Sequence, residues 1–158
     1  MHAMTKLLDR VLQVVAAALV VLLLATVAAG IVSRGVNHPL SFTDELSGLL
    51  MVWLACFGWM IATRRGAHIR IRFFHDLLPL SAHRVVEAAI QIACVLLGAV
   101  VAWHSVHLMR TNSDVEMTTL PMASAWLYVP LFPAGLLTVG QALADLQALI
   151  RRAPDGAA

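Results

Sequence analysis

The sequence predicts an all-α integral membrane protein with four transmembrane helices and a further amphipathic helix lying at the membrane interface in a cytoplasmic loop. Of its 158 residues, 60% are hydrophobic and only 13% are charged, whereas a soluble domain is usually about 45–50% apolar and about 25% charged. Four runs lack Asp, Glu, Lys and Arg, and each is close to the ~20 residues that a helix needs to cross a bilayer. Lys and Arg are concentrated on one side of these runs. We expect the spans to form a single membrane domain over residues 1–158.

The first predicted span covers residues 11–33. Lys6 and Arg10 precede it and small residues occupy positions 28–30, a pattern that a secretory signal peptide also has. The hydrophobic region of a signal peptide is usually only about 7–15 residues long. The length of this run therefore favours a retained membrane anchor.

The second predicted span covers residues 42–63, although its charge-free part is short. Ser41 and Asp44 fit the S/T-x-x-D/E capping box, which places the start of the helix near Phe42. The third span is predicted over residues 88–109.

The fourth predicted span covers residues 123–149. Its first half contains prolines, which remove a backbone donor and clash with the preceding turn of a helix. A late start, a tilt or a kink is therefore expected there. The prolines in and just before this part are Pro121, Pro130 and Pro133.

The distribution of Lys and Arg predicts how the helices are oriented. Nine basic residues flank the spans on one side, and only Arg34 and Arg110 lie on the other. Because short loops rich in Lys and Arg stay in the cytoplasm, both termini and the central loop are predicted to be cytoplasmic. The nine residues are Lys6, Arg10, Arg64, Arg65, Arg70, Arg72, Arg84, Arg151 and Arg152.

The central loop contains the sequence IRIRFFHDLL at residues 69–78. As a helix, this segment has a broad apolar face opposite a polar one, which is typical of a helix in the membrane plane. The alternation at residues 69–73 also fits a short extended piece. We expect basic side chains around this loop to contact anionic lipid headgroups; the candidates are Arg64, Arg65, His68, Arg70 and Arg72.

The sequence gives little sign of catalytic chemistry. None of the charge-free runs contains a carboxylate, and no Ser-His-Asp or H-E-x-x-H pattern is present. The net charge of +2 is too small to predict a nucleic-acid partner, and Cys56 and Cys94 form no metal motif. We therefore expect a protein without enzymatic activity and without a cofactor or metal.

His104 and His107 are the strongest exception to this expectation. They lie three residues apart near the end of the third span, so a helix would place them on one face. One interpretation is a metal site or an axial ligand of a membrane haem. The other, which we favour, is that they are interfacial or packing residues.

Several residues of the second span are candidates for contacts with partners. Trp53 lies near the middle of the span, where it either fills space or anchors a partner subunit. Gly58, followed by Ala62, would allow another helix to approach closely. Asp44 and Glu45 either cap the helix, where its dipole favours acidic groups, or contribute to a docking site on the outer side.

The stretch from Ser41 to Pro79 resembles the small membrane subunit of tripartite ATP-independent periplasmic (TRAP) transporters, the DctQ-like family. That family has an acidic pair opening the second helix, then a Trp, a glycine, Arg-x-x-x-His-Ile and Leu-Pro. The matching positions here are Asp44 and Glu45, Trp53, Gly58, Arg64 through His68-Ile69, and Leu78-Pro79, with Arg34 after the first helix. The chain differs from the family at Phe42, Ser47, Gly48, Ile71 and Arg72.

The resemblance implies a function. A soluble periplasmic protein captures an organic acid, and a large membrane subunit carries it inward at the expense of a sodium gradient. The small subunit packs beside the large one as part of the fixed scaffold and contributes to docking of the soluble protein. The alternative is a haem- or quinone-associated membrane anchor of a respiratory enzyme, for which His104 and His107 are the motive.

Overall fold

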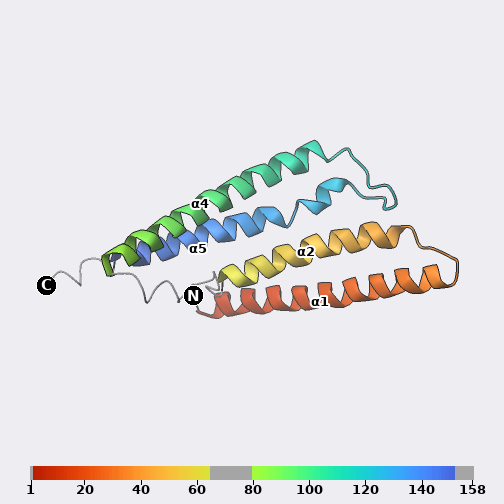
Figure 1. Cartoon of the computed structure of the whole chain (residues 1–158), viewed down its shortest axis with the longest axis horizontal. Coiled ribbons are helices and arrows are strands. Elements are labelled where there is room, and N and C mark those ends of the chain that lie inside the picture. The colour runs from red at the N-terminus through yellow and green to blue at the C-terminus, as the bar shows by residue number, and fades with distance from the viewer. Residues whose placement is uncertain (1, 65–79, 152–158) are drawn as a thin grey trace.

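The computed structural model describes residues 2–64 and 80–151, and side chains over 7–64 and 85–150. These parts form four long helices and one short 3₁₀ helix (Figure 1). In chain order they are α1 (His2–Gly35), α2 (Phe42–Arg64), α4 (Leu80–Thr111), η1 (Ser124–Leu127) and α5 (Leu131–Arg151). All four long helices are long and apolar enough to cross a membrane. The predicted fold class of four membrane-spanning helices is therefore confirmed. The predicted interfacial helix at 69–78 lies outside the described residues.

The helices extend beyond the charge-free runs because charged residues continue a helix into the headgroup region without breaking it. α1 begins nine residues before the predicted span at position 11 and ends at Gly35, and α4 begins at Leu80, eight residues before the predicted position 88. α2 begins at Phe42, as predicted. The Asp44 carboxylate, which a capping box would direct back to Ser41, is bonded to Arg34.

The fourth span is interrupted, as its prolines predict. η1 is followed by a turn, and α5 starts only at Leu131, directly after Pro130. Pro130 has no N–H for a preceding turn and disfavours helical backbone at Val129. Pro133 lies within the first turn of α5, where the missing N–H has no intrahelical partner in any case.

The turn from α1 to α2 is short and closed by backbone hydrogen bonds. Asn37 adopts a left-handed conformation with φ of 57°, and its N–H donates to the Arg34 carbonyl while that of His38 donates to the Ser33 carbonyl. Asparagine tolerates this conformation better than most residues. The turn therefore ends α1 and returns the chain antiparallel into α2.

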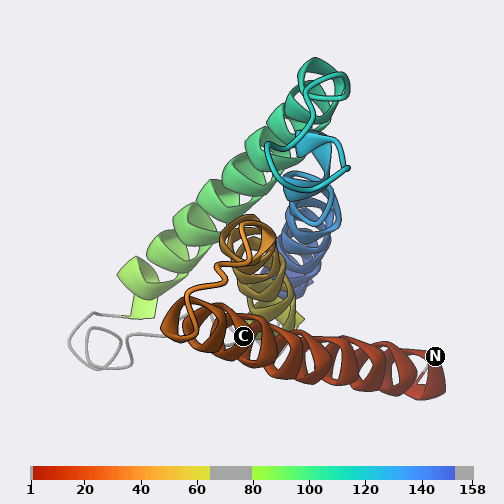
Figure 2. The ribbon, with the colours of Figure 1, turned by 90° about the vertical axis from the view of Figure 1, so that its right-hand side faces the viewer.

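The long helices form two antiparallel hairpins, α1–α2 and α4–α5, and α2 also packs on α5 (Figure 1). The α1–α2 turn and segment 112–130 lie at one end of the bundle, which we call the loop end. α1 begins and α5 ends at the opposite end, the terminal end. Viewed along the bundle, α1 slants away from α4 and lies on the outside of the assembly (Figure 2).

α4 and α5 approach each other closely. A Cβ at Gly98 would lie 2.9 Å from the Gly135 carbonyl oxygen, and one at Gly135 would lie 2.8 Å from that of Gly98. Ala102, one turn after Gly98, is 8% exposed and faces the same contact. Small residues four apart let helix backbones approach closely in a membrane, so this crossing depends on residues without side-chain volume.

Little of this apolar protein is buried within itself. In the most apolar 18-residue stretch of α1 and of α4, only 11% of the residues are buried. The share is 28% in α2 and in the span that contains α5. Apolar side chains such as Val21, Val85 and Trp103 are more than two-thirds exposed. Such surfaces are stable only against lipid or against another membrane protein.

Candidate functional site

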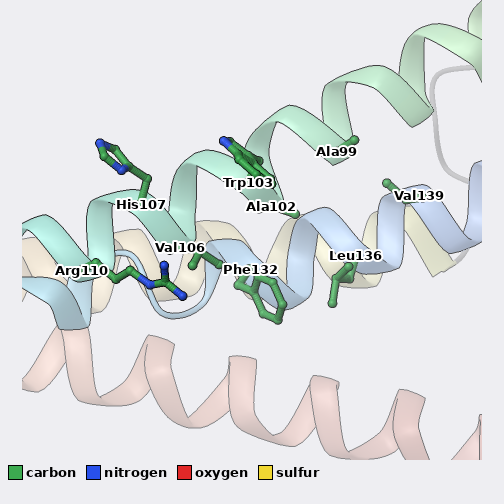
Figure 3. Close-up of a pocket in the computed structure, with 9 residues that line it drawn as sticks. All are labelled: Ala99, Ala102, Trp103, Val106, His107, Arg110, Phe132, Leu136 and Val139. Carbon is green, nitrogen blue, oxygen red and sulfur yellow. The ribbon is translucent and has the colours of Figure 1, made fainter.

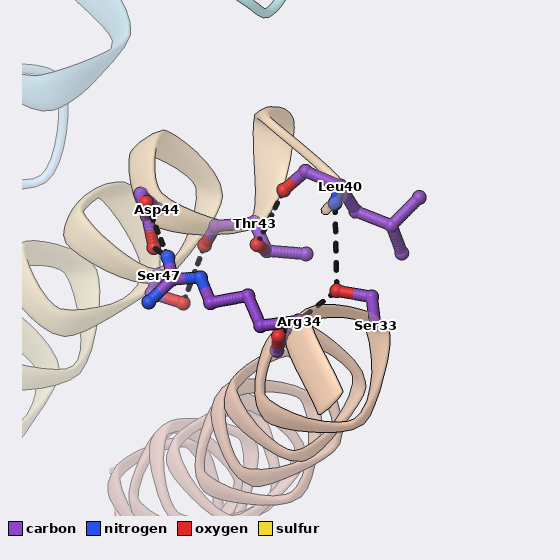
Figure 4. Close-up of polar contacts among 7 residues, drawn as sticks. Ser33, Arg34, Leu40, Thr43, Asp44 and Ser47 are labelled. Atoms are coloured by element: carbon purple, nitrogen blue, oxygen red, sulfur yellow. Dashed lines mark hydrogen bonds and ion pairs between the residues drawn. The ribbon is translucent and has the colours of Figure 1, made fainter. Parts of the chain in front are cut away.

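An ion pair at the loop end joins α1 to α2. Arg34 Nη2 lies 2.5 Å from Asp44 Oδ1 and 2.6 Å from Oδ2. Both side chains remain more than half exposed, so the pair is presented on the surface of the loop end (Figure 4). Its two residues are ten apart in sequence, and the tight turn at Asn37 brings them together.

Hydroxyl groups below this ion pair fix the turn. The Ser33 hydroxyl donates to the Gly30 carbonyl at 2.9 Å and accepts from the Leu40 N–H at 3.4 Å. The Thr43 hydroxyl donates to the Leu40 carbonyl at 2.7 Å. A Cβ at Gly30 would lie 3.0 Å from the Thr43 hydroxyl oxygen, so α1 and α2 are in close contact here.

Glu45 ties the two hairpins together at the loop end. Its carboxylate accepts hydrogen bonds from the backbone N–H groups of Thr118, Thr119 and Leu120 at 2.8, 2.7 and 3.1 Å, and from the Thr119 hydroxyl at 2.5 Å. Three consecutive amides that point at one carboxylate make a backbone anion site. We refer to this contact, between Glu45 and residues 118–120, as the Glu45 clamp.

Trp53 makes a second link between the hairpins, deeper along α2. Its indole Nε1–H donates to the Trp126 carbonyl at 2.9 Å. Its ring stacks with those of Phe57 and Trp126, each with centroids 6.4 Å apart. Trp53 therefore has a packing role within this chain and is half-buried there.

Gly58 contacts no other helix within the described part of the chain. Gly58 and Ala62 are both exposed on α2, and no atom lies within 4 Å of a Cβ built at Gly58. The close contact forms instead at Gly98 and Gly135. The Gly98-x-x-x-Ala102 spacing on α4 could have indicated it, but the same spacing is common in membrane helices.

At the terminal end, Arg64 is paired within the protein. Its Nε lies 2.5 Å from Asp9 Oδ1, and its side chain is 18% exposed. Sequence reasoning gave Arg64 only a headgroup role, because its acidic partner is 55 residues away on another helix. The other candidate headgroup residues, Arg65, His68, Arg70 and Arg72, lie outside the described part of the chain.

The histidines of α4 lie on the outside of the bundle. His104 and His107 are both exposed. Within residues 7–64 and 85–150, no group of three or more His, Cys, Asp or Glu side chains is placed to hold a metal ion. Cys56 is buried and Cys94 is half-buried, and each is a free thiol.

Comparison with known proteins identifies the family of this chain. The model of the family described as tripartite ATP-independent periplasmic transporters, DctQ component, matches residues 23–152. The chain is also 28% identical over 148 residues to the sialic acid TRAP transporter small permease protein SiaQ of Vibrio cholerae serotype O1, covering 92% of this chain and 85% of that protein. The resemblance seen in residues 41–79 is thereby confirmed: the chain belongs to the DctQ family, the small permease components of TRAP transporters.

Proposed function

We propose that this protein is the non-catalytic small membrane subunit of a sodium-gradient-driven uptake transporter for organic acids that depends on a periplasmic binding protein. In this proposal it packs beside the large membrane subunit as part of the fixed scaffold. It also contributes to docking of the soluble binding protein. The membership in the DctQ family supports the transporter role.

The single observation that best supports a scaffold is how the hairpins are joined. The Glu45 clamp connects α2 to segment 118–120, and the Trp53 indole connects α2 to Trp126. Links at two depths resist hinge motion between the hairpins. A subunit that stays rigid can brace a partner that moves.

The buried polar groups also support a scaffold rather than a solute pathway. All six that the described side chains contribute are Ser or Thr, and five donate to a carbonyl three or four residues earlier. Intramembrane pathways for ions usually carry ionisable groups facing the interior. The six are Thr26, Ser33, Thr43, Thr63, Ser105 and Thr138.

We place the docking surface at the loop end. The Arg34–Asp44 pair is exposed there, and so are Asp114 and Glu116 of the segment after α4. Exposed charges of this kind steer a soluble partner and set its orientation. Glu45 contributes indirectly, because its clamp fixes the shape of segment 118–120.

We place the interface with the large subunit on the exposed apolar faces. The open surface around Gly58 on α2 leaves room for a helix of the partner, and α1 exposes most of its apolar length. Partner helices commonly approach at small residues of this kind.

We further propose that the protein is a multi-pass protein of the bacterial inner membrane with both termini in the cytoplasm. The excess of nine basic residues over two supports this orientation. The loop end is then periplasmic, where it can meet the binding protein. The terminal end lies among anionic headgroups, which the basic residues at 65–72 are suited to contact.

Deletion of the gene tests the main proposal. Uptake of labelled carboxylates, with sialic acid included because of the name of the Vibrio cholerae relative, should be lost and should return on complementation. Collapse of the sodium gradient in the complemented strain should abolish the same uptake. Uptake that is unchanged after deletion would refute the proposal.

Charge reversal at the loop end tests the docking surface. Replacement of Asp114 and Glu116 by Lys should weaken binding of the soluble protein to the purified membrane complex, because the charges that orient it are inverted. The large subunit should remain bound, since neither residue lies on the proposed membrane interface. Unchanged affinity for the soluble protein would remove this assignment.

A bulky side chain at Gly58 tests the interface with the large subunit. Gly58→Leu fills the open surface on α2 and should reduce co-purification of the large subunit. Gly140→Leu is the matched control, because Gly140 of α5 is also exposed and also has no atom within 4 Å of a built Cβ. Full recovery of the large subunit with Gly58→Leu would place the interface elsewhere.

A visible absorption spectrum of the purified protein tests the alternative of a haem-bearing respiratory anchor. A b-type haem gives an intense Soret band, and our proposal predicts none. Replacement of His104 and His107 by Gln should accordingly leave the visible absorption spectrum unchanged. A Soret band that these replacements abolish would establish the alternative.

A further inference from the structure

A groove of about 600 Å³ runs along the outer side of the α4–α5 hairpin (Figure 3). This volume lies within the range of about 300–1,000 Å³ that is usual for small-molecule sites. Its walls are apolar over most of their length. They include Ala99, Trp103 and Val106 of α4 and Phe132, Leu136 and Val139 of α5.

The polar residues of the groove lie at its loop end. His107 and Arg110 of α4 line it there, and the Arg110 side chain extends along the groove towards Phe132 (Figure 3). Within residues 7–64 and 85–150, no carboxylate is within ion-pairing distance of Arg110. Arg34 and Arg64, by contrast, each pair with an aspartate.

The length of the groove matches one leaflet of a bilayer. From Ala99 to Arg110 an α-helix rises about 16 Å, and half of a ~30 Å hydrocarbon core is about 15 Å. An acyl chain that lies along the apolar walls would therefore bring its headgroup to the level of Arg110. A guanidinium donates in a planar fork that suits phosphate oxygens.

We propose that this groove binds one glycerophospholipid from the leaflet at the loop end. One acyl chain lies between α4 and α5, and the phosphate is held by Arg110 with His107 beside it. A hydrophobic helix of a partner protein is the less suitable occupant, because it would cover Arg110 without supplying a counter-charge. The lipid supplies both the apolar chain and the charge.

Lipid titration of the purified transporter complex, followed by native mass spectrometry, tests this proposal. The probes are phosphatidylglycerol and, as a lipid without phosphate, diacylglycerol. The wild type should retain one phosphatidylglycerol more tightly than diacylglycerol. Arg110→Gln should weaken phosphatidylglycerol binding about fivefold, since one basic residue near an anionic lipid contributes roughly a factor of five, and should leave diacylglycerol binding unchanged.

A second variant tests the apolar part of the groove. Ala99→Phe places a ring among the lining residues and should abolish retention of both lipids. The matched controls are Arg10→Gln, which removes a charge at the terminal end, and Ala93→Phe, which adds a ring at another exposed position of α4. Both controls should bind lipid as the wild type does.

Two results would overturn the proposal. One is equal phosphatidylglycerol binding by the wild type, Arg110→Gln and Ala99→Phe. The other is loss of the large subunit from Ala99→Phe with no lipid bound to the wild type, which would identify a protein helix as the occupant of the groove.

Discussion

Gly135→Ala is the most direct test of the packing between α4 and α5. The added Cβ would lie 2.8 Å from the Gly98 carbonyl oxygen and 2.9 Å from the Ala102 nitrogen. Optimal contacts between non-bonded carbon atoms are about 3.5–4.0 Å, so the methyl group is too close by roughly 0.5 Å or more. Both neighbours are backbone atoms and cannot rotate away. The two helices must therefore move apart along their crossing.

The magnitude follows from comparison with a second glycine of the same helix. No atom lies within 4 Å of a Cβ built at Gly140. Alanine favours a helix over glycine by about 1 kcal/mol, and this gain applies to both substitutions and cancels between them. Overpacking of a tight contact usually costs about 1–3 kcal/mol. Gly135→Ala should therefore have a free energy of unfolding about 1–3 kcal/mol lower than that of Gly140→Ala.

Unfolding in mixed micelles of mild detergent and SDS measures this difference. Tryptophan fluorescence reports the transition, since Trp53 and Trp126 stack across the hairpins, and circular dichroism reports the helices. Equal unfolding free energies for the two variants, within about 0.5 kcal/mol as expected for surface substitutions, would refute the close α4–α5 crossing.

Three further predictions concern the links at the loop end. Glu45→Gln should speed hydrogen exchange of the backbone N–H groups at 118–120, because the glutamine side chain replaces the carboxylate that accepts all three of their hydrogen bonds. Unchanged exchange rates would argue against the Glu45 clamp. Trp53→Phe keeps an aromatic ring at this position but removes the indole N–H donor, and should lower the unfolding free energy by about 1 kcal/mol. An unchanged unfolding free energy would count against that hydrogen bond. The double swap Arg34→Asp with Asp44→Arg should restore any stability lost in either single charge reversal. Each single reversal should lower the unfolding free energy by at most about 1 kcal/mol, because the pair is exposed. A double variant no more stable than the single variants would contradict the ion pair.

Hydropathy was sufficient to predict the four helices, because a membrane span needs a long uncharged run and little else. The late start of α5 was also predictable, since Pro130 acts through local backbone geometry. Helix ends were less predictable. Charged residues at both ends of α1 continue the helix beyond the hydrocarbon region. Composition does not indicate at which residue such an extension ends.

The contacts between helices were mostly beyond sequence reasoning. Glu45 was recognised as one of an acidic pair, but its partners are backbone amides 73–75 residues away, and a backbone amide has no sequence signature. Gly58 and Gly98 have the same small-residue spacing, yet among the described residues Gly98 faces a neighbouring helix and Gly58 does not. Which of two equivalent patterns is used depends on how the helices rotate and cross.

Purification of the tagged protein from native membranes tests the central claim most directly. A tag at the C-terminus, extraction in mild detergent and mass spectrometry would identify the proteins that co-purify. Our account predicts one much larger polytopic membrane protein in roughly equal amount. Recovery of the chain alone, or together with subunits that carry flavin and iron–sulfur clusters, would contradict it.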